Sequence, residues 1–499
     1  MPTPTHQHGA APGRRPAPPR DAAGDGDPRP RVRTAAPEGG AAGARGAGRR
    51  SLGDRVIGWY GGQLDRRIAT HPDLVRRGFV LGFAAKRWQA RHLPNSRLMP
   101  WGRMAERLSL ENVTSALEHP DEAVVTSIFL PNEVFHAMGL HPVSAEAISC
   151  FVSGTQAESG VIAEAHARGI PETYCSYHKV LVGAALSGVI ARMPMLASCS
   201  VACDANNLTF RAISQSWGSP HVYVDVPYDQ GDDSILYVAD QLRALGRTAQ
   251  DVYGRRLDED ALRQGVGRSI ATCERLGTQL ARHRGRYLAN TMTHELHLAL
   301  AMHLGLGTPQ TLELVETLGR DLDAAPAYAG DSLVWVHTTP YFLQGIGSQV
   351  NLSQRAQIAC SDMSYDQAIL PGEARRFDAS APFEAMAERL VRNPFNGPVE
   401  RRAGRAAELA RLVGADGAVV FCHWGCKSTC GGAQLIRSEL ERAGVPTLVL
   451  DGDGCDRAMC MKGQMETRFS AFLELVDQGG TGRRAATRDG DAGSGGGAR

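Results

Sequence analysis

The sequence lacks long hydrophobic runs, an excess of charge of either sign, and a recognisable export signal. No run of about 18 apolar residues occurs, so no membrane-spanning helix and no membrane contact are expected. The formal net charge is only +1, which gives no reason to expect nucleic acid or an anionic membrane as a partner. The length of 499 residues allows two or three domains with a large buried core, and the hydrophobic fraction of 43% is that of an ordinary globular protein.

Secretion and disulfide bonding are equally unsupported by the sequence. Arg14-Arg15 is followed by Pro, Arg, Asp and Gly rather than by an apolar run, so no signal peptide is predicted and a cytoplasmic location is expected. The chain has 11 cysteines, an odd number, and a disulfide framework is not expected in a long chain without a secretion signal. Clustered cysteines in a reducing compartment more often bind metal or carry out redox chemistry.

Composition and periodicity divide the chain into five segments. Residues 1–51 are dominated by Pro, Ala, Gly and Arg, and 478–499 are similarly poor in large apolar side chains, so both are predicted to be disordered tails. Between them we expect N-terminal helices with a first α/β lobe at 52–231, a helical region at 232–330 and a second α/β lobe at 331–477.

Short apolar runs alternate with helical stretches in both expected lobes, which favours parallel sheets in an α/β fold. The runs that predict strands are 122–131, 147–152, 195–198 and 221–226 in the first lobe, and 332–338, 417–422 and 446–454 in the second; the stretches that predict helices include 54–92, 133–138, 232–246, 258–283, 288–304, 426–443 and 463–476.

The densest cysteine group is Cys422, Cys426 and Cys430, which begins at a strand end and runs into a helix. Strand ends and helix N-termini are where α/β proteins bind anionic ligands, and Cys426 in the loop is the best-placed ligand. The spacing CxxxCxxxC is one residue longer than the CxxxCxxC motif of radical S-adenosylmethionine enzymes, so that class of enzyme is disfavoured. Zinc is also disfavoured, because no two CxxC-like pairs occur. Core cysteines at the end of a buried strand remain an alternative.

Two further loops place a cysteine between a strand and a helix. They contain Cys175, and Cys199 with Cys203. Loops of this kind in two lobes can converge on a cleft, where three thiolates would fill three corners of a [4Fe–4S] cubane and leave one iron open.

Several motifs in these loops resemble one known family. Asn132–Pro142 is similar to a PxELxxAxGxxP signature, and Cys175-Ser-Tyr before a helix is similar to the family's first ligand segment. Ala202-Cys203-Asp204, followed by HVYVDVP, resembles its second ligand segment, and His423-Trp-Gly-Cys426-Lys resembles its third. Residues 450–453 and 463–469 resemble its closing signature. The family is that of the 2-hydroxyacyl-CoA dehydratases and benzoyl-CoA reductases, and the resemblance covers about residues 120 to 477.

The resemblance implies two Rossmann-like lobes with helical additions and a [4Fe–4S] cluster on Cys175, Cys203 and Cys426 in the cleft. It also implies a radical 2-hydroxyacyl-CoA dehydratase or a related aryl- or acyl-CoA reductase that acts on an acyl-CoA substrate. A homodimer or a related second subunit is implied as well, together with an ATP-hydrolysing iron–sulfur activator that supplies a low-potential electron. One-electron reduction of the thioester carbonyl makes loss of the 2-hydroxyl feasible and acidifies carbon 3, and the cluster would supply that electron.

The sequence departs from this family in its additional thiols. Cys199, Cys422, Cys430, Cys455 and Cys460 flank the expected ligands. Two alternatives therefore stay open: an ATP-coupled reductase of small molecules with a double-cubane cluster, and a cluster-binding electron-transfer or partner subunit without turnover of its own.

Three other residues are candidates near the expected site. Glu133 starts a helix and is a candidate general base or substrate contact, although helix capping explains it as well. His178 and His423 neighbour expected ligands, and either can donate a hydrogen bond to cluster sulfur, which would tune the reduction potential.

Overall fold

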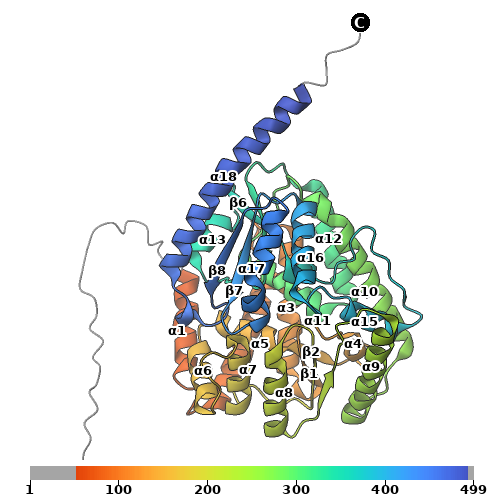
Figure 1. Ribbon diagram of the computed structural model, residues 1–499. Coiled ribbons are helices and arrows are strands. Elements are labelled where there is room, and N and C mark those ends of the chain that lie inside the picture. Colours follow the sequence, from red (N-terminus) through yellow and green to blue (C-terminus); the bar gives the residue numbers. More distant parts are fainter. Residues whose placement is uncertain (1–51, 493–499) are drawn as a thin grey trace, which may run out of the picture. The chain divides into compact units, whose positions relative to one another are not determined.

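The computed structural model describes the backbone of residues 52–492 and the side chains of residues 53–478 (Figure 1). The tail predicted over 1–51 and the last residues of the predicted C-terminal tail, 493–499, lie outside the described part. No helix within the described residues has the length and apolar character needed to cross a membrane.

The first lobe is built on a four-stranded parallel sheet. Its strands are β1 (Ala123–Thr126), β2 (His141–Ser144), β3 (Met195–Cys199) and β4 (His221–Val224), in the order β2-β1-β3-β4. Each strand is only four or five residues long; β1 and β3 are buried throughout, whereas three of the four residues of the edge strand β4 are partly exposed. Because the first connection leads to one edge and the third strand pairs on the other side of β1, the strand order reverses between β1 and β3, which is where α/β sheets bind ligands.

The second lobe repeats this topology. Its strands β5 (Asp331–Val336), β6 (Ala356–Ser361), β7 (Gly417–His423) and β8 (Thr447–Gly452) form a parallel sheet in the order β6-β5-β7-β8. Helices α16 and α17 pack against this sheet, and α13 and α18 pack against it from another side (Figure 1). The two parallel-sheet lobes expected from the sequence are therefore confirmed.

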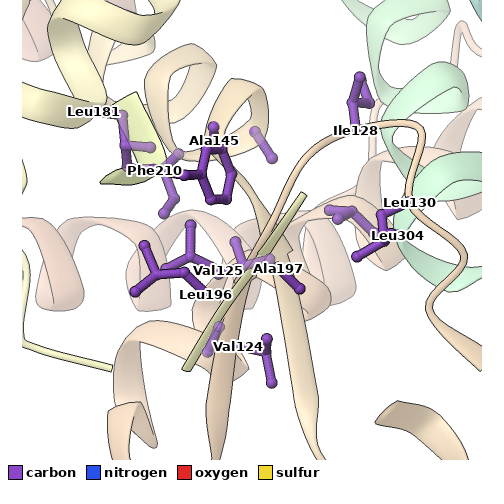
Figure 2. Close-up of a cluster of buried hydrophobic side chains, with 14 of the residues drawn as sticks. Val124, Val125, Ile128, Leu130, Ala145, Leu181, Leu196, Ala197, Phe210 and Leu304 are labelled. Atoms are coloured by element: carbon purple, nitrogen blue, oxygen red, sulfur yellow. The ribbon is translucent and has the colours of Figure 1, made fainter. Parts of the chain in front are cut away.

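The buried core explains why the sequences of these strands are continuously apolar rather than alternating. In β5, Leu333 and Trp335 contribute to one buried cluster, whereas Val334 and Val336 contribute to another. Both faces of the second sheet are thus covered, as parallel sheets require. In the first lobe, Figure 2 shows Val125 of β1 beside Leu196 of β3.

A predominantly helical segment links the lobes, as the sequence predicts for 232–330 (Figure 1). The helices of the described chain are α1 (Leu52–Asp65), α2 (Pro72–His92), α3 (Pro100–Glu118), η1 (Pro120–Glu122), α4 (Glu133–Ala137), α5 (Ala145–Gly154), α6 (Glu158–Ala167), α7 (Ser176–Ser187), α8 (Asp204–Trp217), α9 (Asp232–Tyr253), α10 (Glu259–Gln279), η2 (Leu280–His283), α11 (Met292–Gly305), α12 (Pro309–Ala324), α13 (Gln344–Val350), α14 (Asp362–Tyr365), α15 (Pro382–Val391), α16 (Val399–Val413), α17 (Lys427–Arg442), η3 (Arg457–Met459) and α18 (Lys462–Ala492).

The structure corrects the predicted strand at 147–152, which lies inside helix α5. A short buried apolar run does not distinguish a strand from a buried helix. In this segment the N-cap residue Ser144 favours the helix. Ser144 Oγ accepts a hydrogen bond from the Ala147 backbone N–H at 3.0 Å and starts the helix.

Two edge strands and one helix end also differ from the prediction. Strands β2 and β6 were not predicted, and β2 contains Pro142, which an edge strand tolerates. Helix α18 continues past Val476, where the sequence predicts its end, to Ala492. No proline occurs in that extension, so nothing there removes a backbone donor or clashes with the preceding turn.

Candidate metal centre

One cavity brings together cysteines from both lobes. Its lining includes Cys175, Cys203 and Cys426, the three cysteines expected as ligands, and also Cys150. The empty volume is about 840 Å³, counted out to its open mouth. The apolar part of the lining includes Phe129. Converging sulfur donors beside apolar side chains are a lining that suits a bound cofactor.

Each of the three expected ligands is the N-cap residue of a helix. Cys175 precedes the 12-residue helix α7, Cys203 the 14-residue helix α8, and Cys426 the 16-residue helix α17. The N-terminus of a helix carries partial positive charge and unpaired N–H groups. Three such termini around one cavity offset part of the cost of burying negative charge there.

The loop of the second lobe reaches the first lobe through a glycine. Gly425 has φ +81°, and a Cβ added there would lie 2.7 Å from both Cα and N of Cys175. A residue with a side chain would therefore meet backbone as well as adopt an unfavourable conformation. Only glycine lets the Cys426 loop approach Cys175 this closely.

The segment Asp451–Asp453, at the end of β8, holds the same region together through hydrogen bonds. Asp453 Oδ1 accepts a hydrogen bond from Ser176 Oγ at 2.6 Å and from the backbone N–H of Cys455 at 2.8 Å. Since Ser176 begins α7, this carboxylate ties the first turn of α7 in one lobe to the closing loop of the other. Its role is to position the site rather than to face the cavity.

Both predicted histidines contact the expected ligands. His178 Nε2 lies 3.1 Å from Cys203 Sγ, and His423 Nε2 lies 3.4 Å from Cys175 Sγ. His423 Nδ1 accepts a hydrogen bond from the Gly454 N–H at 3.0 Å. The proton of the neutral His423 ring is therefore on Nε2, which donates toward the Cys175 sulfur.

Burial keeps both rings uncharged at neutral pH. It lowers the pKa of His178 to about 3, and it lowers the pKa of His423 although Asp453 opposes the shift. Burial likewise raises the pKa of the Cys175 and Cys203 thiols. Thiolates in this cavity are thus unfavourable without a cation to neutralise them.

Glu146 is a cavity residue that sequence reasoning missed. It lies in the first turn of α5, and its Oε1 is 3.9 Å from His178 Nε2. Its Oε2 is buried without a hydrogen-bond partner, and burial raises the pKa of the carboxyl to about 7. Ligand atoms of Glu146, His178 and Cys203 lie within 4.8 Å of one another. Recognition of β2 would have placed Glu146 two residues after a strand, much as Cys203 follows β3 and Cys426 follows β7. The prediction that Cys175 also follows a strand is wrong, because its loop connects helix α6 to helix α7.

Glu133, in contrast, is not among the residues that line this cavity. Its buried Oε1 is 2.6 Å from Arg389 and accepts a hydrogen bond from Ser269 Oγ at 2.6 Å. The structure therefore separates Glu133 from the three cysteines and gives it an internal ion pair, which favours a structural role.

The five flanking thiols also lie outside the cavity lining. Cys199 is buried 3.6 Å from Ser127 Oγ, Cys455 is buried near Ser149 O, and Cys460 Sγ lies 2.9 Å from Asp453 O. Cys422 and Cys430 contact each other. Of the cysteines in the described chain, the cavity thus selects the three expected ligands and adds Cys150.

Fold and site together define a class of protein. Two α/β lobes of identical strand order enclose a cavity to which the first lobe contributes two helix-capping cysteines and the second lobe one. That arrangement is suited to a cofactor held by thiolates between lobes.

Comparison with known sequences identifies the family. The profile described as 2-hydroxyglutaryl-CoA dehydratase, D-component, matches residues 127–476, and the chain belongs to that family. The resemblance inferred from the motifs is therefore confirmed. One relative is the alpha subunit of (R)-2-hydroxyglutaryl-CoA dehydratase from Acidaminococcus fermentans, which is 21% identical over 300 residues. The matched region covers 57% of this chain and 61% of that subunit.

Proposed function

We propose that this chain is the cluster-binding subunit of a dehydratase acting on 2-hydroxyacyl-CoA thioesters. The observation that carries the proposal is the convergence of Cys175, Cys203 and Cys426 on one cavity. Each caps a helix, and soft thiolate donors of this kind suit an iron–sulfur cluster. A [4Fe–4S] cluster with one open iron supplies one-electron transfer and a Lewis acid.

The protein would contribute orientation, shielding and proton transfer. His423 and His178 contact the sulfurs of Cys175 and Cys203, and hydrogen bonds to ligand sulfur raise the reduction potential of a cluster. Apolar residues such as Phe129 and Leu300 line the cavity and limit water around the reacting groups. Glu146 has an unpaired oxygen and is the candidate to take up or release the substrate proton.

The partners follow from the same proposal. The Acidaminococcus relative is by name one subunit of its enzyme, so a second related subunit or a second copy of this chain is proposed here. An ATP-hydrolysing iron–sulfur activator would deliver the electron, and the thioester of coenzyme A would be the substrate.

Metal analysis of anaerobically purified protein tests the site. We expect about four iron and four sulfide ions per chain in the wild type, and loss of most of both in Cys175→Ala, Cys203→Ala and Cys426→Ala. Cys360→Ala is the matched control, because Cys360 is buried in β6 and does not line the cavity. Zinc in place of iron, or iron retained in all three variants, would refute the proposal.

Iron stoichiometry and turnover distinguish the alternatives. A double-cubane reductase would hold about twice the iron, with a different electron paramagnetic resonance spectrum after reduction. The five flanking thiols that would favour such a cluster do not line the cavity. An electron-transfer subunit would hold the cluster but show no dehydration with activator, ATP and any partner subunit present.

Glu146→Gln tests the proton-transfer role. The substitution keeps the side-chain volume and removes the base, so iron content should stay at the wild-type value while turnover falls about 10²–10⁴-fold. Wild-type turnover in Glu146→Gln would show that another group moves the proton.

A further inference from the structure

Two thiols that the proposed cluster does not use lie against each other beside the Cys426 loop. The Sγ atoms of Cys422 and Cys430 are 3.3 Å apart. Cys422 is buried at the second-last residue of strand β7. Cys430 is exposed in the first turn of α17. This is the arrangement of a buried thiol and an accessible thiol in direct contact.

The local backbone holds the two thiols together. The carbonyl oxygen of His423 accepts hydrogen bonds from the Cys426 N–H and from the Cys430 S–H, both at 3.1 Å. The first turn of α17 is thereby folded back onto the end of β7. A disulfide bond is about 2.05 Å long, so bond formation requires the sulfurs to approach by only about 1.3 Å.

The exposed thiol is also the more reactive of the two. Cys430 is the thiol of the pair that solvent reaches, and its sulfur accepts the hydrogen bond donated by the buried Cys422. The N-terminus of α17 favours a thiolate at the same place. A thiolate that solvent can reach, with a second thiol in contact, is the usual arrangement of a peroxide-reactive cysteine and its resolving partner.

We propose that Cys422 and Cys430 form a reversible disulfide when the protein meets a hydroperoxide. The Cys430 thiolate attacks the peroxide O–O bond, which gives a sulfenic acid on Cys430 and releases hydroxide from hydrogen peroxide. The Cys422 thiol then attacks that sulfur and releases water. The two thiols lose two electrons and two protons in total, and the peroxide is reduced to two waters. A small thiol restores both cysteines by exchange.

This disulfide would enclose the segment that carries Cys426. The bond would join the end of β7 to the first turn of α17, with the proposed ligand in the loop between them. Cys426 Sγ itself lies 3.6 Å from Thr429 Oγ1 and contacts neither of the paired thiols within hydrogen-bond distance. The pair can therefore consume oxidant at the edge of the site without using the cavity thiols.

Peptide mapping after mild oxidation tests the inference on the full chain. Protein purified without oxygen is treated with hydrogen peroxide, alkylated and digested with trypsin without reduction. Cleavage after Lys427 separates Cys422 from Cys430, so the disulfide appears as two linked peptides that a small thiol releases. Because Cys426 shares a peptide with Cys422, the digest is repeated on Cys426→Ser.

The expected result is a linked species in wild type and in Cys426→Ser, and its loss in Cys422→Ser and Cys430→Ser. Cys273→Ser is the matched control and should keep the link, because Cys273 is buried in a different helix. A link from Cys430 to Cys426, or no link while Cys430 is converted to sulfinic acid, would overturn the inference. So would a fall in bound iron in Cys430→Ser, since the thiol would then be a metal ligand. None of these outcomes depends on dehydratase activity.

Discussion

The substitution Gly425→Ala tests whether the two lobes must approach each other to build the site. Gly425 has φ +81°, a conformation that costs an L-residue about 1–2 kcal/mol. The added Cβ would lie 2.7 Å from backbone atoms of Cys175, and overpacking of this kind costs about 1–3 kcal/mol. Because the obstacle is backbone rather than a flexible side chain, we expect the two costs to add to about 2–5 kcal/mol.

The structure can relieve this strain by moving the Cys426 loop away from Cys175. We therefore expect Gly425→Ala to lose most of its iron and sulfide, even where enough stability remains for folding. Urea unfolding monitored by circular dichroism gives the free energy of unfolding, and metal analysis of the same anaerobic preparation gives iron per chain. The two measurements separate a displaced loop from a chain that fails to fold.

Gly431→Ala is the matched control for this experiment. Gly431 lies in the same segment, in helix α17, and a Cβ added there meets nothing within 4 Å. Replacement of a helical glycine by alanine should stabilise the protein by about 0.5–1 kcal/mol and leave iron content unchanged. If Gly425→Ala matched wild type in both stability and iron content, the argument that this contact assembles the site would be wrong.

Two further predictions concern buried charges outside the cysteine set. Arg389→Met leaves the Glu133 carboxylate buried without its partner, so the free energy of unfolding should fall by about 3–5 kcal/mol in urea titrations; a change below about 1 kcal/mol would argue against a structural role. For His303, burial opposes the charged ring, but Asp366 at 3.3 Å raises its pKa above 6.5. The charged form is thus favoured in the folded state, and the stabilisation is full below about pH 6.5 and lost as pH rises through the folded pKa. The difference in unfolding free energy between wild type and His303→Gln should shrink from about pH 5.5 to pH 8.5, and a difference that grew with pH would contradict the assignment.

Much of the site could be predicted because local signals mark it. Cys175, Cys203 and Cys426 each stand directly before an amphipathic or apolar helix, and two of them follow a recognisable strand. Glu146 could not be predicted in the same way. Its strand, β2, is four residues long and contains a proline, and α5 reads as a strand because its apolar residues are nearly continuous.

Long-range contacts were beyond the reach of pattern reasoning. Cys175 and His423 are 248 positions apart in the chain, and no local sequence pattern predicts that their side chains are in contact. The same holds for Glu133, which occupies the position of a family motif and yet pairs with Arg389 rather than lining the cavity. Sequence pattern identifies residues of the right chemistry, but packing decides which of them face one another.

The repeated topology accounts for why the cavity offers three capping cysteines rather than four. In each lobe the helix after the third strand begins next to a cysteine: Cys203 follows β3 and Cys426 follows β7. The two lobes differ at the helix that precedes the third strand, which is α7 in the first lobe and α16 in the second. In the first lobe α7 is capped by Cys175, whereas in the second lobe α16 is capped by Pro398, which has no donor atom.

The first turn of α16 contributes a buried ion pair to the cavity wall. Arg402, in the first turns of α16, lines the cavity and is held by Asp362 at 2.8 Å and by Thr429 at 3.0 Å. A buried guanidinium that is fixed in this way stabilises negative charge that develops nearby. The lobes thus differ at this helix: the first lobe supplies a capping cysteine, whereas the second supplies a capping proline and, in the first turn, an arginine paired with Asp362.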